Sequence, residues 1–128
     1  MPNRAGPKTF PVLIALLLMP LPTIANAADP AAGQKVFKSA CALCHPVMQG
    51  KNGLGPGLFG IVGSKSGQVP GFRYSAPNQK ADLTWDEATL DKYLQAPGAV
   101  IPHTTMVYAG LKDDAKRADL IAYLATLK

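Results

Sequence analysis

The stretch C-A-L-C-H at residues 41–45 holds both cysteines of the chain and one of its two histidines. Three kinds of chemistry use a C-x-x-C motif: a redox-active disulfide, half of a zinc site, and covalent attachment of haem. Cys41 and Cys44 could serve in any of the three, and His45 could be a ligand in the last two. The rest of the chain has to decide between them.

Two of these chemistries fit the sequence poorly. A thioredoxin-like redox pair lies where a strand meets a helix, whereas a helical pattern precedes Cys41. A zinc site would consume Cys41, Cys44, His45 and His103 as its four ligands. His103 lies far outside zinc-finger spacing, and the C-x-x-C-H triplet would crowd three ligands onto one turn. Both alternatives are therefore less favoured than haem.

Covalent haem attachment accounts for every member of the motif. Two thiols add to the two vinyl groups of the porphyrin and fix its orientation, and the adjacent imidazole reaches the iron from one face. The sequence therefore predicts one haem c attached through Cys41 and Cys44, with His45 as an iron ligand.

The sixth position of an octahedral iron needs a second ligand from elsewhere in the chain. Met48 is only three residues beyond His45 and too close to cross to the opposite face. Met106 lies far enough along the chain to wrap around the haem, and His103 is an alternative that would give a bis-histidine site of lower potential. We favour Met106 because His/Met ligation is the usual arrangement in haem proteins that carry electrons.

The elements that position these residues are predicted to be helical. Asp29 is a plausible N-cap with Pro30 at the first helical position. Thr84 and Glu87 form a capping box, and the helix that they begin should stop before Pro97. The three helical patterns lie within residues 29–44, 84–97 and 113–128.

Between the first two helical patterns, residues 50–71 contain eight of the chain's 12 glycines and show no sustained period. We expect a compact irregular loop in which glycine permits close approach to a bulky object. Three modest helices bury little apolar surface, and two cysteines are too few to compensate with several disulfides. A large apolar group should therefore occupy the middle of the domain.

The first 27 residues have the features of a secretory signal peptide. A basic start is followed by a short apolar run and by an A-x-A sequence that ends at Ala27. We therefore predict a cleaved signal peptide at 1–27, a single domain at 28–128 and a periplasmic location. An uncleaved membrane anchor is the alternative, but prolines interrupt the apolar run and it falls short of the roughly 20 residues that span a bilayer.

The charge of the chain is only mildly basic. Loss of Arg4 and Lys8 with the signal peptide would lower the formal net charge from +5 to +3. No basic run is interleaved with aromatic residues, so nothing indicates a nucleic-acid partner.

Six motifs resemble class I cytochrome c in order and spacing, across the chain from Gly33 to Leu127. The resemblance is to mitochondrial cytochrome c and its short bacterial periplasmic relatives. The motifs are C-A-L-C-H, G-P-G-L-F-G-I-V-G, G-Q-V-P-G-F-R-Y-S, L-T-W-D-E-A-T-L-D-K-Y-L, I-P-H-T-T-M and R-A-D-L-I-A-Y-L.

This resemblance implies an all-α fold of three to five helices wrapped around one covalently bound haem, with long irregular loops. It also implies a soluble one-electron carrier of an electron-transport pathway such as a respiratory chain, and not an enzyme. Its partners would be larger redox proteins, and it would be a monomer without a small-molecule substrate.

The resemblance also assigns roles around the haem. The residue matching Pro56 supports the axial histidine through its backbone carbonyl, and those matching Tyr74 and Trp85 hydrogen-bond the haem propionates. The remaining matches lie near the methionine. Residues matching Asn78, Tyr93 and Thr104 form a polar network near the sulfur of Met106. Tyr108 stands where a phenylalanine usually lies near the haem.

Three departures from the family pattern concern the docking face. Thr105 and Ala40 stand where lysines are common, and Ser64 stands where an arginine commonly supports a propionate. We therefore expect transient docking that is only partly electrostatic. A small haem peroxidase or a gas-binding haem protein is the alternative function, and either would need a labile sixth ligand.

Overall fold

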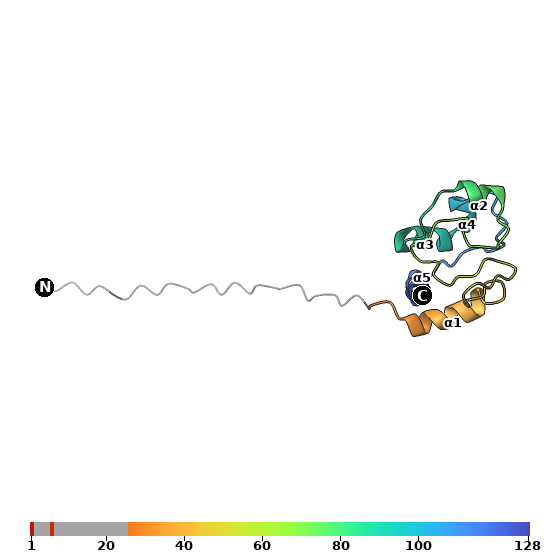
Figure 1. Ribbon diagram of the computed structural model, residues 1–128. Coiled ribbons are helices and arrows are strands. Elements are labelled where there is room, and N and C mark those ends of the chain that lie inside the picture. Colours follow the sequence, from red (N-terminus) through yellow and green to blue (C-terminus); the bar gives the residue numbers. More distant parts are fainter. Residues whose placement is uncertain (2–5, 7–25) are drawn as a thin grey trace.

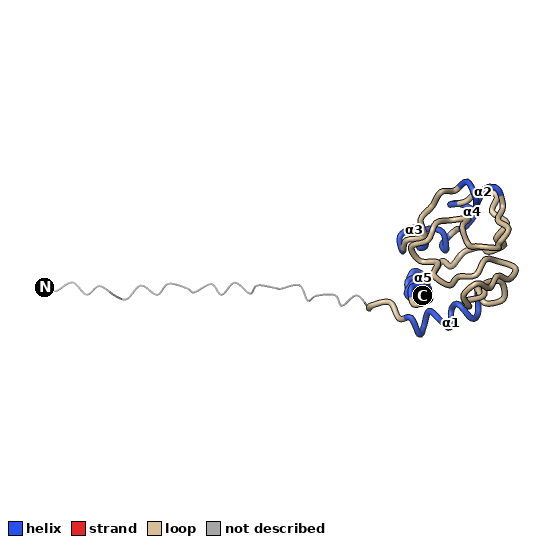
Figure 2. Tube along the Cα trace, in the orientation of Figure 1, coloured by secondary structure: helices blue, strands red, loops and turns tan. Residues whose placement is uncertain are grey.

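The computed structural model describes Met1, Gly6 and residues 26–128 (Figure 1). Within these residues the chain forms five helices and no strands, which confirms the predicted all-α fold (Figure 2). The helices are α1 (Pro30–Ala40), α2 (Ala76–Lys80), α3 (Glu87–Gln95), α4 (Pro97–Val100) and α5 (Asp114–Ala125). None of the described helices is long and apolar enough to cross a membrane. The predicted signal peptide at 1–27 lies almost wholly outside the described residues.

Helix α1 begins as its sequence predicts. The side chain of Asp29 accepts a hydrogen bond from the backbone N–H of Ala31 at 2.8 Å, and Pro30 is the first helical residue. Proline suits this position because its missing N–H would have no partner within the helix. The helix ends at Ala40, so the cysteine motif follows it directly.

Helices α1 and α5 pack against each other at very short range (Figure 1). Gly33 permits this contact, because a Cβ at that position would collide with the backbone carbonyl of Asp119 on α5. One turn further along, the ring of Phe37 packs on Tyr123 with centroids 5.4 Å apart. The first and last helices of the folded region therefore pack directly against each other.

The start of helix α3 differs from the predicted capping box. Asp86 is the N-cap, and its carboxylate accepts a hydrogen bond from the Thr89 backbone N–H at 2.7 Å. Thr84 instead forms an isolated antiparallel bridge with Lys65. The prediction of Thr84 as the cap was wrong because long-range backbone pairing holds that residue in an extended conformation.

This cap makes the stability of the protein depend on pH. The hydrogen bond from the Thr89 backbone N–H lowers the pKa of Asp86, so its carboxylate stabilises the fold at neutral pH. Asp86→Ala should lower the urea midpoint at pH 7, and the difference from wild type should shrink as the pH falls below the usual aspartate value of about 4. Thr84→Ala is the control and should show no such pH-dependent difference. An equal effect of both substitutions at every pH would contradict this role of Asp86.

Two short helices, α2 and α4, carry no periodic signal in the sequence. Each has a proline in its first two positions, at Pro77 in α2 and Pro97 in α4. Proline is pre-organised for a helix start, but four or five residues are too few to display an apolar face of period 3.6. They were missed for that reason.

The glycine-rich loop combines two uses of glycine. Gly55 lies against the ring of His45, and a side chain there would collide with it, as expected for close approach. Gly60 and Gly63 instead have open space around them and positive φ angles of 68° and 86°. At these two positions the positive φ angle by itself accounts for glycine, because other residues rarely adopt this conformation.

Candidate functional site

A cavity of about 440 Å³ lies at the centre of the domain, between α3, α5 and the loops. All of the predicted site residues line it, although they come from widely separated parts of the chain. They are Cys41, Cys44, His45, Pro56, Tyr74, Asn78, Trp85, Tyr93, Thr104, Met106 and Tyr108.

The two cysteines lie on the turn that ends α1. This turn is closed by hydrogen bonds from the backbone N–H of Cys41 to the Phe37 carbonyl at 2.8 Å and from that of His45 to the Cys41 carbonyl at 3.0 Å. Burial raises the pKa of the Cys41 thiol to about 11, and nearby Cys44 contributes to the rise. Redox-active C-x-x-C pairs have a thiol with a lowered pKa, so this environment disfavours redox cycling.

His45 is held by a hydrogen bond to the loop. Its Nδ1 lies 2.8 Å from the backbone carbonyl oxygen of Pro56 and donates to it. A proton on Nδ1 leaves the Nε2 lone pair available to a metal, and such a partner also fixes the orientation of the ring. The geometry therefore prepares His45 as a ligand.

Met106 is held by a tyrosine from α3. The hydroxyl of Tyr93 donates to the Met106 sulfur at 3.2 Å, and the Met106 backbone N–H donates to Thr104 Oγ1 at 3.3 Å. The ring of Tyr93 packs on Trp85 with centroids 4.7 Å apart, and burial raises the pKa of its hydroxyl. Tyr93 is thus a neutral donor that holds the thioether sulfur at the cavity.

Two polar atoms on the cavity wall have no hydrogen-bond partner among the described residues. They are Ser75 Oγ and Asn78 Oδ1, and both are buried. A buried polar group without a partner costs about 1–3 kcal/mol, so such atoms indicate a missing polar ligand. The hydroxyl of Tyr74 accepts from the Val69 N–H at 3.3 Å and still has its own proton to donate.

Ser75 was not among the predicted site residues. In the sequence Ser75 is the last residue of the motif G-Q-V-P-G-F-R-Y-S and follows Tyr74 directly, and this is the signal that could have drawn attention to it.

The remaining wall of the cavity is apolar. No lysine, arginine, aspartate or glutamate lines it among the described residues. The apolar lining away from the mouth includes Leu58, Ile61, Phe72, Leu90, Leu94, Leu120 and Leu124. An apolar wall with a few polar atoms, two thiols and an imidazole fits a haem, which has an apolar ring and carboxylate-bearing edges.

The other candidate ligands lie elsewhere. His103 is exposed, does not line the cavity, and adopts a left-handed backbone conformation with φ 60°. Met48 is 65% exposed and lines a different cavity. Of the candidate sixth ligands named from the sequence, Met106 is the one that lies with the cysteines and His45.

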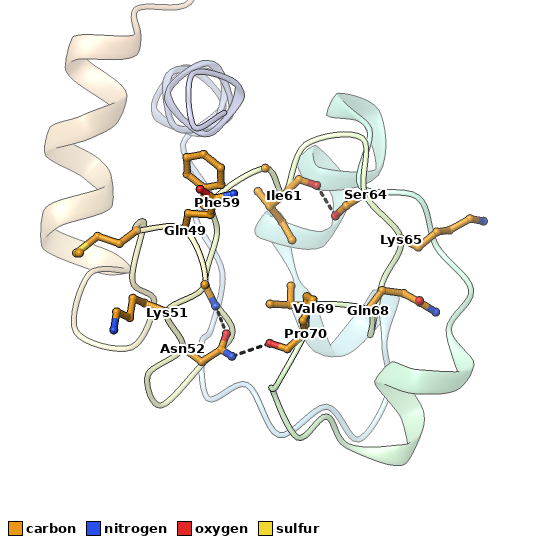
Figure 3. Close-up of a pocket in the computed structure, with 14 residues that line it drawn as sticks. Gln49, Lys51, Asn52, Phe59, Ile61, Ser64, Lys65, Gln68, Val69 and Pro70 are labelled. Atoms are coloured by element: carbon orange, nitrogen blue, oxygen red, sulfur yellow. Dashed lines mark hydrogen bonds between the residues drawn. The ribbon is translucent and has the colours of Figure 1, made fainter.

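That second cavity lies between the loops at residues 48–60 and 61–70 (Figure 3). Asn52 ties the two loops together, since its side-chain Nδ2 donates to the Pro70 carbonyl at 3.0 Å and its Oδ1 accepts from the Gly57 N–H at 2.8 Å. Among the described residues the two cavities have Ile61 in common, so they are separate sites that meet at this side chain.

Comparison with known proteins gives a consistent result. The family model for cytochrome c matches residues 30–128. Cytochrome c2 from Rhodomicrobium vannielii is 54% identical over 101 residues, which cover 78% of this chain and 80% of the relative. Cytochrome c from Euglena viridis is 42% identical over 100 residues, or 78% of this chain and 98% of the relative.

A solved structure has a similar fold. Cytochrome cH from Methylobacterium extorquens superposes with a TM-score of 0.73 at 44% sequence identity. The match covers 77% of this chain and 99% of that chain.

Proposed function

Since the chain belongs to the cytochrome c family, we propose that it carries single electrons between larger redox proteins in the periplasm, with His45 and Met106 as the ligands of its haem iron. Membership of this family brings with it one covalently bound haem c and the role of an electron carrier, not an enzyme. The observation that carries the finer proposal is the hydrogen bond from Tyr93 to the Met106 sulfur inside the cavity that Cys41, Cys44 and His45 also line.

When bound, the haem supplies an iron that gains and loses one electron. The chain's own residues keep the site unchanged while this happens. The Pro56 carbonyl fixes the ring of His45, and the hydroxyl of Tyr93 fixes the thioether of Met106. Because both side chains are already oriented by neighbours, little has to rearrange between the two redox states.

The apolar wall has a further consequence for the redox potential. Side chains such as Leu90, Leu94 and Leu120 exclude water and lower the local dielectric constant. A low dielectric disfavours the more highly charged oxidised state, and thioether ligation acts in the same direction. We therefore propose a reduction potential in the upper part of the range for haem proteins.

The mouth of the cavity is the proposed docking face. Leu54, Val107 and Thr105 line the cavity and are exposed, and exposed Leu43 lies between the two cysteines. Thr105 and Ala40 both line the cavity, and they are uncharged at positions where lysines are common in the family. Apolar contact should therefore dominate the centre of the interface. Lysines further out would add a partly electrostatic steering term.

We also propose that residues 1–27 direct export and are removed. This assignment rests on the signal-peptide pattern in the sequence.

One set of measurements on the native protein, purified after export, tests these proposals together. The intact mass should equal residues 28–128 plus one haem, and the redox titration should follow a single one-electron curve. The reduced protein should bind carbon monoxide slowly or not at all, because Met106 occupies the sixth position. Rapid carbon monoxide binding would instead favour a peroxidase or a gas-binding protein, and a mass that includes residues 1–27 would indicate a retained anchor.

A further inference from the structure

Arg117 on α5 is the one charged side chain that is fully buried among the described residues, with 3% of its surface exposed. A buried charge is tolerated only when it is paired and hydrogen-bonded. Its Nε donates to Asp91 Oδ1 at 2.6 Å and its Nη2 to Asp114 Oδ1 at 2.8 Å. Arg117 does not line the central cavity, so the site described above leaves it without a role.

The third nitrogen of the Arg117 guanidinium, Nη1, contacts the chain segment that follows Met106. This nitrogen donates to the backbone carbonyls of Leu111 at 2.9 Å and Lys112 at 3.5 Å. One guanidinium group therefore connects α5, α3 through Asp91, and the end of the segment at residues 107–112. Only a planar group with several donors can make these contacts at once.

The same end of the segment is also attached to the last turn of α3. The Leu111 backbone N–H donates to the Leu94 carbonyl at 2.8 Å. Gly110 has a φ angle of 103°, and a Cβ there would collide with the Gln95 carbonyl. Close contact with α3 is thus built into the backbone at this point.

Met106 itself lies in a segment without regular structure. From α4 onwards the chain has no helix until α5, and His103 adopts a left-handed conformation that is uncommon for residues other than glycine. The local hydrogen bonds of this segment are scattered turn contacts, such as those from the Thr104 N–H to the Ile101 carbonyl and from the Tyr108 N–H to the Met106 carbonyl, so the attachment at its far end should add to its stability. Tyr93 and Asp91 both belong to α3, so this helix contacts Met106 directly through Tyr93 and the end of the segment through Asp91 and Arg117.

We propose that Arg117 is a positioning residue for Met106: by clamping the segment at residues 107–112 to α3, it keeps the thioether in place at the site. This inference rests on the proposed ligation by Met106. The hydrogen bond to Asp91 raises the pKa of Arg117, so the clamp stays charged at every working pH. Removing one partner of a buried ion pair leaves the other uncompensated, and this is what would release the segment.

The experiment measures how easily an added ligand displaces the methionine in the oxidised holoprotein. Imidazole is titrated while the weak red absorption band of methionine-ligated ferric haem is followed. Imidazole binds only when the segment opens, so its apparent affinity is proportional to the open fraction. Arg117→Lys should raise that affinity about tenfold or more, and Asp91→Ala should raise it in the same direction.

Two control variants separate positioning from general stability. Asp114→Ala removes the other carboxylate that Arg117 contacts, but Asp114 is 85% exposed and should leave the imidazole affinity near that of wild type. Phe37→Leu removes the ring that packs on Tyr123, so it should weaken the contact between α1 and α5 and lower the unfolding midpoint. Phe37 does not line the cavity that holds Met106. The substitution should therefore not change imidazole binding.

The possible outcomes test the positioning role of Arg117 separately from the ligation of the iron by Met106. A wild-type protein without the red band would overturn the ligation by Met106 and the positioning role with it. A wild-type band that is present, together with wild-type imidazole affinity in Arg117→Lys and Asp91→Ala, would overturn the positioning role alone. An equal rise of affinity in Phe37→Leu at matched loss of stability would also overturn it, because the effect would then be general.

Discussion

The variant Cys41→Ala, Cys44→Ala is expected to lack haem and to be largely unfolded at room temperature. The central cavity of about 440 Å³ is lined mainly by apolar side chains of α3, α5 and the loops. Without haem this apolar wall would face water or would have to collapse, and a small domain has little other apolar burial to compensate for the loss. Far-UV circular dichroism and a urea titration would measure the loss.

The matched control for this variant keeps both thiols. Leu43 lies between the two cysteines with 90% of its surface exposed, so Leu43→Ala should retain haem and unfold cooperatively near the wild-type midpoint. A haem-free double variant with native helix content and a cooperative transition would show that the polypeptide forms its own core. The account of the haem as the missing core would then be wrong.

The second large effect is expected at the sixth position of the iron. Met106→Leu should abolish the weak red absorption band of the ferric protein, lower the reduction potential, and allow the reduced protein to bind carbon monoxide. Leucine has a similar volume but no sulfur, so it removes the proposed ligand and the acceptor of the Tyr93 hydroxyl without leaving a large void. Thioether ligation favours the reduced iron, and this sets the sign of the change in potential.

His103→Ala serves as the control for the sixth ligand. His103 is exposed and does not line the cavity, so its replacement should leave the band and the potential close to wild type. If His103→Ala abolished the band while Met106→Leu kept it, His/Met ligation would be wrong. Spectra and redox titrations of the two variants give the answer directly.

The long helices could be predicted because their signals are local. The cap at Asp29 and the apolar positions around Leu120 act over one or two turns, and the structure follows both. Helices α2 and α4 were missed because they are too short to show a period. The cap of α3 was misassigned to Thr84 because a backbone pairing with Lys65 outweighed the local pattern.

Arg117 shows the same limit for a charged residue. Its helical spacing from Leu120 and Ile121 places it on the buried face of α5, but an arginine is usually exposed, and the local pattern does not name the groups that would pair with it. Its burial follows from carbonyls and a carboxylate that other segments bring to it. Ser75 was missed for a similar reason, since its buried hydroxyl is recognisable only next to the cavity.

The sequence by itself determined the attachment half of the site. Cys41, Cys44 and His45 are close together along the chain, so their spacing, with the helical pattern before it and the missing apolar core, favours one group that they can hold. Only the tertiary structure separates the candidates for the other half by position, 61 residues away along the chain. It brought Met106 to Tyr93 and the cavity and left His103 outside, because such contacts depend on how α3, α5 and the intervening segment pack.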